Sequence, residues 1–126
     1  MKIDREKAET WATWFRALGD PTRIVILNLV ANAGKPMSVA EIVEAVDVGQ
    51  STVSHHLKIL GEVRFVLVAH EGTSSRWWIN ENCLGCFPTA AELVMGRAPN
   101  AAQWEALTST PEPKQPARTT KRGRVG

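Results

Sequence analysis

The sequence has no long apolar segment, because no stretch of its 126 residues approaches the uninterrupted apolar length needed to cross a bilayer. Its first residues, Met1–Glu6, are not followed by the apolar core of a signal peptide. It also lacks a phosphate loop and any Ser, His and Asp set typical of nucleophilic catalysis. We therefore expect a soluble protein of the cytoplasm with no membrane partner.

Cysteine is scarce. The only two, Cys83 and Cys86, are three positions apart and too close to staple a fold. This usage is typical of a reducing compartment, where thiols serve as ligands or redox groups.

A strong positive charge is missing from most of the chain, although the net charge is +2. Residues 111–126 hold five basic residues and one acidic residue, which leaves 10 basic and 12 acidic residues in 1–110. Any binding of nucleic acid must therefore depend on a local motif, because the body carries no bulk positive field.

The composition favours one modest domain, since 126 residues with 44% hydrophobic side chains support a single core. We assign this domain to residues 1–96. Residues 97–126 hold four of the seven prolines and form a C-terminal extension. A short helix is predicted from Asn100 to Leu107, and disorder with a basic end from Thr108 onward.

Two helices are predicted in the first third of the chain. The first covers Arg5–Leu18, where apolar residues recur at spacings of three and four. The second follows Asp20, a good N-cap, has Pro21 as its first residue and extends to about Ala33. Its expected apolar stripe consists of Ile24, Leu27 and Ala31.

A helix-turn-helix is predicted over residues 38–61. Ser38 and Glu41 have the spacing of a capping box, so one short helix begins there. A Gly-containing turn leads to a second helix from Ser51, a capping candidate, to about Leu60. In such a motif the second helix enters the major groove of double-stranded DNA.

The second helix of this motif has two chemically distinct faces when its residues are placed about 100° apart. The core-facing residues are Val53, Leu57 and Leu60. The residues on the opposite face are Ser51, Ser54, His55 and Lys58. Hydroxyl, imidazole and ammonium groups without a carboxylate suit base edges and phosphates, whereas an ordinary solvated face more often mixes both charge signs.

A β-hairpin follows, with strands at Phe65–His70 and Arg76–Ile79 and a polar loop at Glu71–Ser75. A hairpin directly after such a helix is arranged as a wing. Arg76 is then either a contact to phosphate or the minor groove or a plain exposed side chain. The fold class is mainly α with a small β-hairpin, a winged helix-turn-helix.

Residues 15–23 (FRALGDPTR), residues 51–60 (STVSHHLKIL) and the hairpin together resemble the ArsR/SmtB family of winged-helix repressors, over roughly residues 10–95. The resemblance implies a homodimer, formed through the first and last helices, that occupies a palindromic operator until an inducer releases it. The DNA contacts that it implies are Ser51, Thr52, Ser54, His55 and Lys58. One departure is Glu62–Phe65, where the family usually has a glycine in the turn.

The resemblance also implies a sensor site. The family's frequent thiolate motif lies on the helix that here begins at Ser38, and this helix has no Cys or His. Cys83 and Cys86 remain as metal ligands. Pro88 and the capping-box spacing of Thr89–Glu92 predict a helix start nearby, so the cysteines precede that helix or form its first turn. A helix N-terminus is expected to lower the pKa of these thiols.

Several inducers fit two thiols. As(III) or Sb(III) needs a third donor, from water, an exogenous thiol or the partner chain, whereas Zn or Cd needs about four ligands, perhaps from both subunits. We favour arsenite.

Other interpretations of the cysteines stay open. They are also a candidate redox pair that closes a disulfide under oxidant, or two small residues without a chemical role. A thiol oxidoreductase is the alternative from another class, but its C-x-x-C normally follows a strand in a βαβ unit, which is not predicted here. A winged helix that serves only protein contacts is a third possibility.

Overall fold

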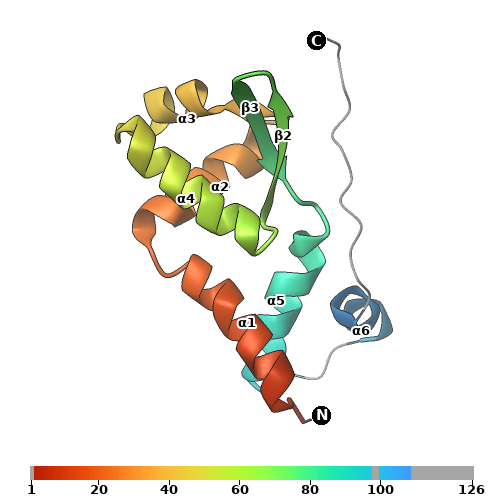
Figure 1. Ribbon diagram of the computed structural model, residues 1–126. Helices are drawn as coiled ribbons and strands as arrows, with labels where there is room; N and C mark the ends of the chain where they lie inside the picture. The colour runs from red at the N-terminus through yellow and green to blue at the C-terminus, as the bar shows by residue number, and fades with distance from the viewer. Residues whose placement is uncertain (1, 98–99, 109–126) are drawn as a thin grey trace.

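Figure 1 shows the computed structural model of the protein, in which residues 2–97 and 100–108 are described. Expectations for residues 109–126, including disorder and the basic end, lie outside the described residues. The elements in chain order are α1 (Arg5–Ala17), α2 (Pro21–Asn32), β1 (Met37–Ser38), α3 (Val39–Val46), α4 (Gln50–Glu62), β2 (Val66–Glu71), β3 (Ser74–Ile79), α5 (Cys83–Val94) and α6 (Ala101–Thr108).

Three predicted helix starts are confirmed by their caps. The Asp20 carboxylate accepts hydrogen bonds from the backbone N–H groups of Thr22 (2.8 Å) and Arg23 (3.3 Å). Ser38 and Glu41 form the reciprocal capping box, with distances of 3.1 and 2.8 Å. The short helix α6 is capped by Asn100, which exchanges two hydrogen bonds with Gln103.

The predicted stripe of α2 is wrong. Ile26 and Val30 are buried, whereas Ile24 is 51% exposed. The error has a physical reason: α2 carries apolar residues on almost every side, so helical spacing alone does not select the side that faces the core.

Two predicted helix caps are wrong, at Ser51 and at Thr89, although Cys83 and Cys86 do form the first turn of α5, one of the two predicted arrangements. Gly49, and not Ser51, is the N-cap of α4, and no side chain caps that helix among the described residues. Helix α5 begins at Cys83, so Pro88 lies inside it and Thr89 is buried in its middle. The earlier start places Cys86, Ala90 and Leu93, at spacings of four and three, on one buried stripe.

The wing is a three-stranded antiparallel sheet with strand order β1-β3-β2. Its hairpin is tighter than predicted, because Glu71 pairs with Ser74 and leaves only two residues in the turn. The first of them, Gly72, has φ +61°, which glycine adopts without steric cost. Strand β1 is only two residues long and was not predicted.

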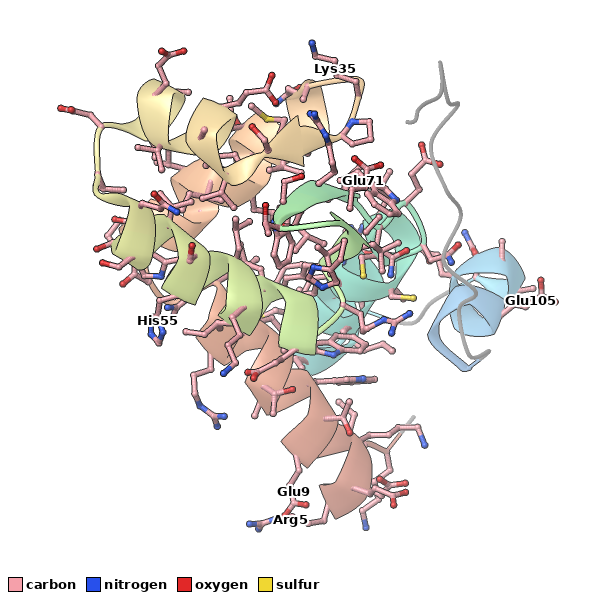
Figure 2. All side chains as sticks on the ribbon, turned by 45° about the horizontal axis from the view of Figure 1, so that its top comes forward. Arg5, Glu9, Lys35, His55, Glu71 and Glu105 are labelled. Carbon is pink, nitrogen blue, oxygen red and sulfur yellow. The ribbon has the colours of Figure 1, made fainter. Side chains whose placement is uncertain are left out.

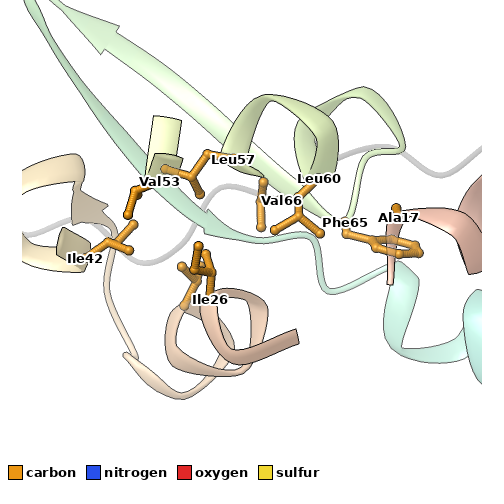
Figure 3. Close-up of a cluster of buried hydrophobic side chains, with 9 residues drawn as sticks. Ala17, Ile26, Ile42, Val53, Leu57, Leu60, Phe65 and Val66 are labelled. Carbon is orange, nitrogen blue, oxygen red and sulfur yellow. The ribbon is translucent and has the colours of Figure 1, made fainter. Parts of the chain in front are cut away.

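Two apolar clusters organise the described residues. The larger one lies between α2, α3, α4 and the sheet (Figure 3); its fully buried side chains include Ile26, Ile42, Val53, Leu57 and Leu60. The smaller one joins α1 to α5 through Trp11, Ala90 and Leu93. These two helices lie side by side at the end of the molecule away from α3 (Figure 1).

Aromatic contacts join α5 to α1 and to the residue before β2. The ring of Phe87 on α5 lies 5.2 Å from Phe15 on α1 and 5.3 Å from Phe65, which precedes β2.

In the described part of the chain no helix combines the length and apolar character that a membrane span requires.

Candidate DNA-binding surface and thiol pair

Helix α4 presents an uninterrupted polar face. All five residues expected to contact DNA are exposed: Ser51, Thr52, Ser54, His55 and Lys58. His55 points away from the body of the molecule (Figure 2). The core-facing residues Val53, Leu57 and Leu60 are fully buried, as the sequence predicted. The two faces are therefore as expected, and the individual DNA contacts stay predictions.

The N-terminus of α4 is open as well. Gly49 has no side chain, and Gln50 and Ser51 are exposed. The first N–H groups of a helix have no partner within the helix, and they carry the positive end of its dipole. Among the described residues no side chain caps them, so they are available to a DNA phosphate.

A partly buried pair of side chains, Arg23 and His56, holds α4 in place. The Arg23 guanidinium donates a 2.6 Å hydrogen bond to the Ala17 carbonyl and lies 3.2 Å from His56 Nδ1. Because a guanidinium only donates, Nδ1 of His56 accepts. His56 is buried at this junction. Arg23 thus links the end of α1 to α4, a role that its place in the sequence motif did not reveal.

Asp20 completes this junction at the start of α2. Partial burial opposes its charge, but the N–H groups of Arg23 and Thr22 outweigh burial and keep the pKa of the carboxyl below its usual value. The Asp20-Pro21-Thr22-Arg23 segment therefore starts α2 with its first residue and supports α4 with its last.

Arg76 lies within β3, level with Ala69 on β2, two residue pairs short of the hairpin turn. Its guanidinium is 3.8 Å from the Glu41 carboxylate and 3.7 Å from that of Glu71. These exposed pairs are weak, so they do not hold the side chain away from a phosphate. Contact of Arg76 with DNA stays a prediction.

Cys83 and Cys86 occupy the first turn of α5 and are not joined in a disulfide. Cys86 is buried. The Cys83 Sγ lies 3.1 Å from the carbonyl oxygen of Arg64, in the turn between α4 and β2. The sequence correctly predicted that the pair lies at the start of α5. It did not predict the contact of Cys83 with the turn that follows α4.

The expectation of a lowered thiol pKa is wrong. Burial, helped by the neighbouring Cys86, raises the pKa of Cys83 to about 11, although Arg64 acts in the opposite direction. Burial also raises the pKa of Cys86. The penalty for placing a charge out of water exceeds the effect of the helix end at these positions.

The pair supplies two soft donors from one chain. Among residues 2–97 and 100–108, no three His, Cys, Asp or Glu side chains form a group able to hold a metal ion. Two sulfurs one helical turn apart suit an ion with few thiolate ligands, or one that takes further ligands from water or a second chain.

Two residues near the thiols escaped the sequence interpretation. Arg64 has φ +66°, a left-handed conformation that costs a non-glycine residue about 1–2 kcal/mol. Arg64 lies within residues 62–65, where the sequence departs from the family pattern because it lacks a glycine. Asn80 is 2% exposed and its side-chain N–H donates to the Arg64 carbonyl at 2.8 Å.

Together the α3–α4 pair, the wing behind it and the exposed polar helix define the class of protein: a winged helix-turn-helix that binds DNA. Comparisons with known proteins agree. Residues 20–67 match the family model described as bacterial regulatory protein, arsR family.

Three relatives extend the match. An uncharacterized HTH-type transcriptional regulator of Methanocaldococcus jannaschii is 43% identical over 74 residues, 59% of this chain and 82% of the relative. A probable mercury resistance operon repressor of Streptomyces lividans is 33% identical over 107 residues, covering 82% and 79%. The arsenical resistance operon repressor of Bacillus subtilis is 34% identical over 82 residues, covering 63% and 77%.

A solved structure gives the same result. The homodimeric winged helix-turn-helix DNA-binding domain from Mycobacterium bovis has a TM-score of 0.58 and 26% identity, covering 75% of this chain and 89% of that one. The chain belongs to the arsR family of bacterial regulatory proteins. It is a transcriptional regulator, and its relatives are regulators and not enzymes.

Proposed function

We propose that this protein is a homodimeric, cytoplasmic repressor that holds a palindromic operator and leaves it when a thiophilic metal or metalloid ion binds Cys83 and Cys86. The observation that carries the proposal is the position of both thiols in the first turn of α5, with Cys83 in contact with the turn that follows α4. An ion held there touches the elements expected to form the dimer and to contact the operator.

Arsenite is the ion we favour. Two sulfurs and one oxygen would satisfy its three positions, and the Bacillus subtilis relative is named as an arsenical resistance operon repressor. When bound, the ion would supply only thiolate bonds that draw the two cysteines together. The chain's own residues do the rest, since α4 and the wing carry the operator contacts.

Mercuric ion is a second candidate, supported by a separate observation. The described part of one chain offers two sulfurs and no third ligand, and a soft ion with two thiolate bonds needs no more. The Streptomyces lividans relative is named as a probable mercury resistance operon repressor.

A competition panel separates these inducers. Arsenite, antimonite, mercuric chloride, cadmium, zinc and peroxide are added to the protein–operator complex, and release is followed by fluorescence anisotropy. We expect release by arsenite and no release from the variant that combines Cys83→Ser with Cys86→Ser. Release by peroxide alone would mean that the thiols respond to an oxidant and not to an ion. Release of the double variant from DNA by arsenite would mean that the sensor site lies elsewhere.

The dimer is supported by exposed apolar side chains on α1 and α5. Leu84 is 65% exposed, Val94 53% and Met95 84%, and Phe15 lies on the adjacent helix. Burying this surface against a second copy removes it from water. Sedimentation of Met95→Glu is expected to show a monomer. A wild-type chain that sediments as a monomer at micromolar concentration would refute the dimer.

A salt titration tests operator binding itself. Because neutralising phosphates releases counterions, affinity for the promoter DNA of its own gene should fall steeply as salt rises. Absence of DNA binding at every salt concentration would refute the repressor and would mean that this winged helix serves only protein contacts.

A further inference from the structure

The turn between α4 and β2 is held by backbone hydrogen bonds to the last residues of α4. The Arg64 N–H donates to the Gly61 carbonyl at 3.1 Å, and the Phe65 N–H donates to the Leu60 carbonyl at 3.0 Å. The backbone of Arg64 has the left-handed conformation, which residues other than glycine rarely adopt. This turn therefore depends on its contacts to keep its shape.

Two side chains hold the Arg64 carbonyl oxygen. Asn80 donates from Nδ2 at 2.8 Å, and Cys83 donates from Sγ at 3.1 Å. The Asn80 backbone N–H also donates to the Phe65 carbonyl at 3.0 Å. Since a carbonyl oxygen only accepts, the sulfur must carry its hydrogen to make this contact.

We propose that the Cys83 S–H group is a latch that keeps the end of the DNA-binding helix α4 in its operator-binding position. The latch rests on the contact with Arg64, and its use as a switch rests on the proposed function.

Arsenite binding opens the latch by simple substitution. A sulfur–arsenic bond forms at Cys83 while an arsenic–oxygen bond of arsenous acid breaks, and the thiol hydrogen leaves with the hydroxyl group as water. No electrons are transferred. The sulfur keeps its lone pairs but has no hydrogen to donate, so it faces the Arg64 oxygen as one acceptor facing another.

The consequence lies at both ends of the turn. With the Cys83 donor gone, Asn80 alone holds the Arg64 carbonyl, and the left-handed residue is free to relax toward a commoner conformation. Because this short turn connects α4 to β2, that relaxation moves the DNA-binding helix relative to the wing. A shift at this scale is enough to lower affinity for an operator that requires two correctly spaced helices.

Variants at Cys83 test the latch without any ion. Cys83→Ala removes the donor, Cys83→Ser keeps an O–H donor, and Glu81→Ala changes an exposed residue just before α5 as a control. We expect Cys83→Ala to weaken operator binding about fivefold, as for one lost hydrogen bond, with Cys83→Ser and Glu81→Ala within about twofold of wild type. Affinity for non-operator DNA should be the same in all four proteins.

Hydrogen exchange gives a second readout on the wild-type protein. Exchange at the Arg64 and Phe65 amides should accelerate in Cys83→Ala, and in wild type on adding arsenite, while the amides in the middle of α2 remain protected. A uniform acceleration in Cys83→Ala would mean general destabilisation, and would overturn the latch.

The two proposals fail in different ways. If Cys83→Ala binds the operator as tightly as wild type while arsenite still releases wild type, the latch is wrong and the sensor stands. If Cys83→Ala binds weakly but still responds to arsenite, the latch stands and the sensor is misplaced.

Discussion

Helices α4 and α5 both begin without a side-chain cap among the described residues, yet their first turns are opposites. The start of α4 is exposed and free of carboxylates, so its polar groups face solvent. The start of α5 is partly buried, and its thiols are protonated and in contact with protein. A surface that binds DNA must be exposed in the ion-free protein. A site that senses an ion can pass on the signal if the ion breaks a contact that the site makes in the ion-free protein.

The sharpest test of this comparison is to remove the polar groups of α4. Ser54→Ala combined with Lys58→Ala is expected to weaken operator binding by about 2–6 kcal/mol, since each of the two DNA contacts is worth about 1–3 kcal/mol. Fluorescence anisotropy at several salt concentrations measures it, and the salt slope should fall by about one. The control Arg5→Ala removes a charge at the far end of α1 (Figure 2). Unchanged affinity in the double variant would mean that α4 does not contact DNA.

Loss of the support behind α4 should have the next largest effect. Arg23→Gln breaks a charge-assisted hydrogen bond to the Ala17 carbonyl and the contact with His56, which lowers the free energy of unfolding by about 1.5–3 kcal/mol. Urea denaturation measures this. Arg16→Gln changes an exposed arginine on α1 and should shift the free energy by less than about 0.5 kcal/mol. Equal effects of the two variants would argue against a link from α1 to α4.

The turn that joins the two regions can be made more stable. Arg64→Gly removes the penalty of a left-handed side chain and is expected to raise the free energy of unfolding by about 1 kcal/mol. Arg64→Ala is the matched control, because it removes the same guanidinium but keeps the strain. Thermal unfolding separates them, and a glycine variant no more stable than the alanine variant would contradict a strained turn.

The protonated thiols predict a smaller, pH-dependent effect. Because the pKa of Cys83 rises to about 11 in the folded protein from its ordinary 9.0, the unfolded chain loses this proton first. The contribution to stability is complete below pH 9 and is lost as pH rises toward 11. Denaturation of wild type and Cys83→Ala across this range should converge as pH rises. A constant difference would mean that the thiol is not buried as described.

Much of the fold followed from local signals in the sequence. Asp20, Ser38 and Glu41 make the capping bonds that their spacing predicts, and Val53, Leu57 and Leu60 face the core because helical periodicity on α4 is clear. These features depend on residues close in sequence, so the chain alone was sufficient to predict them.

The remaining errors share a different cause. The cap of α5 was misplaced because Pro88 and Thr89 satisfy local rules for a helix start, while packing of Cys86, Ala90 and Leu93 favours a longer helix. The contacts of Arg23 with Ala17 and His56, and of Asn80 with the Arg64 carbonyl, join residues 6 to 33 positions apart in the chain. The raised pKa of Cys83 comes mainly from burial, which depends on how the whole domain packs. Such contacts leave no periodic pattern in the sequence. The candidate DNA contacts on α4 could be predicted because they share one face of a single helix, and they stay predictions.

The Cys83 sulfur reaches a main-chain oxygen and not a side chain of residue 64. A carbonyl oxygen is present whatever amino acid stands there, so substitution at this position during evolution preserves the acceptor as long as the new residue tolerates the backbone conformation. Covariation between the two positions would therefore be absent even where the contact is retained. In an alignment only the cysteine would record the link between α5 and the turn that follows α4.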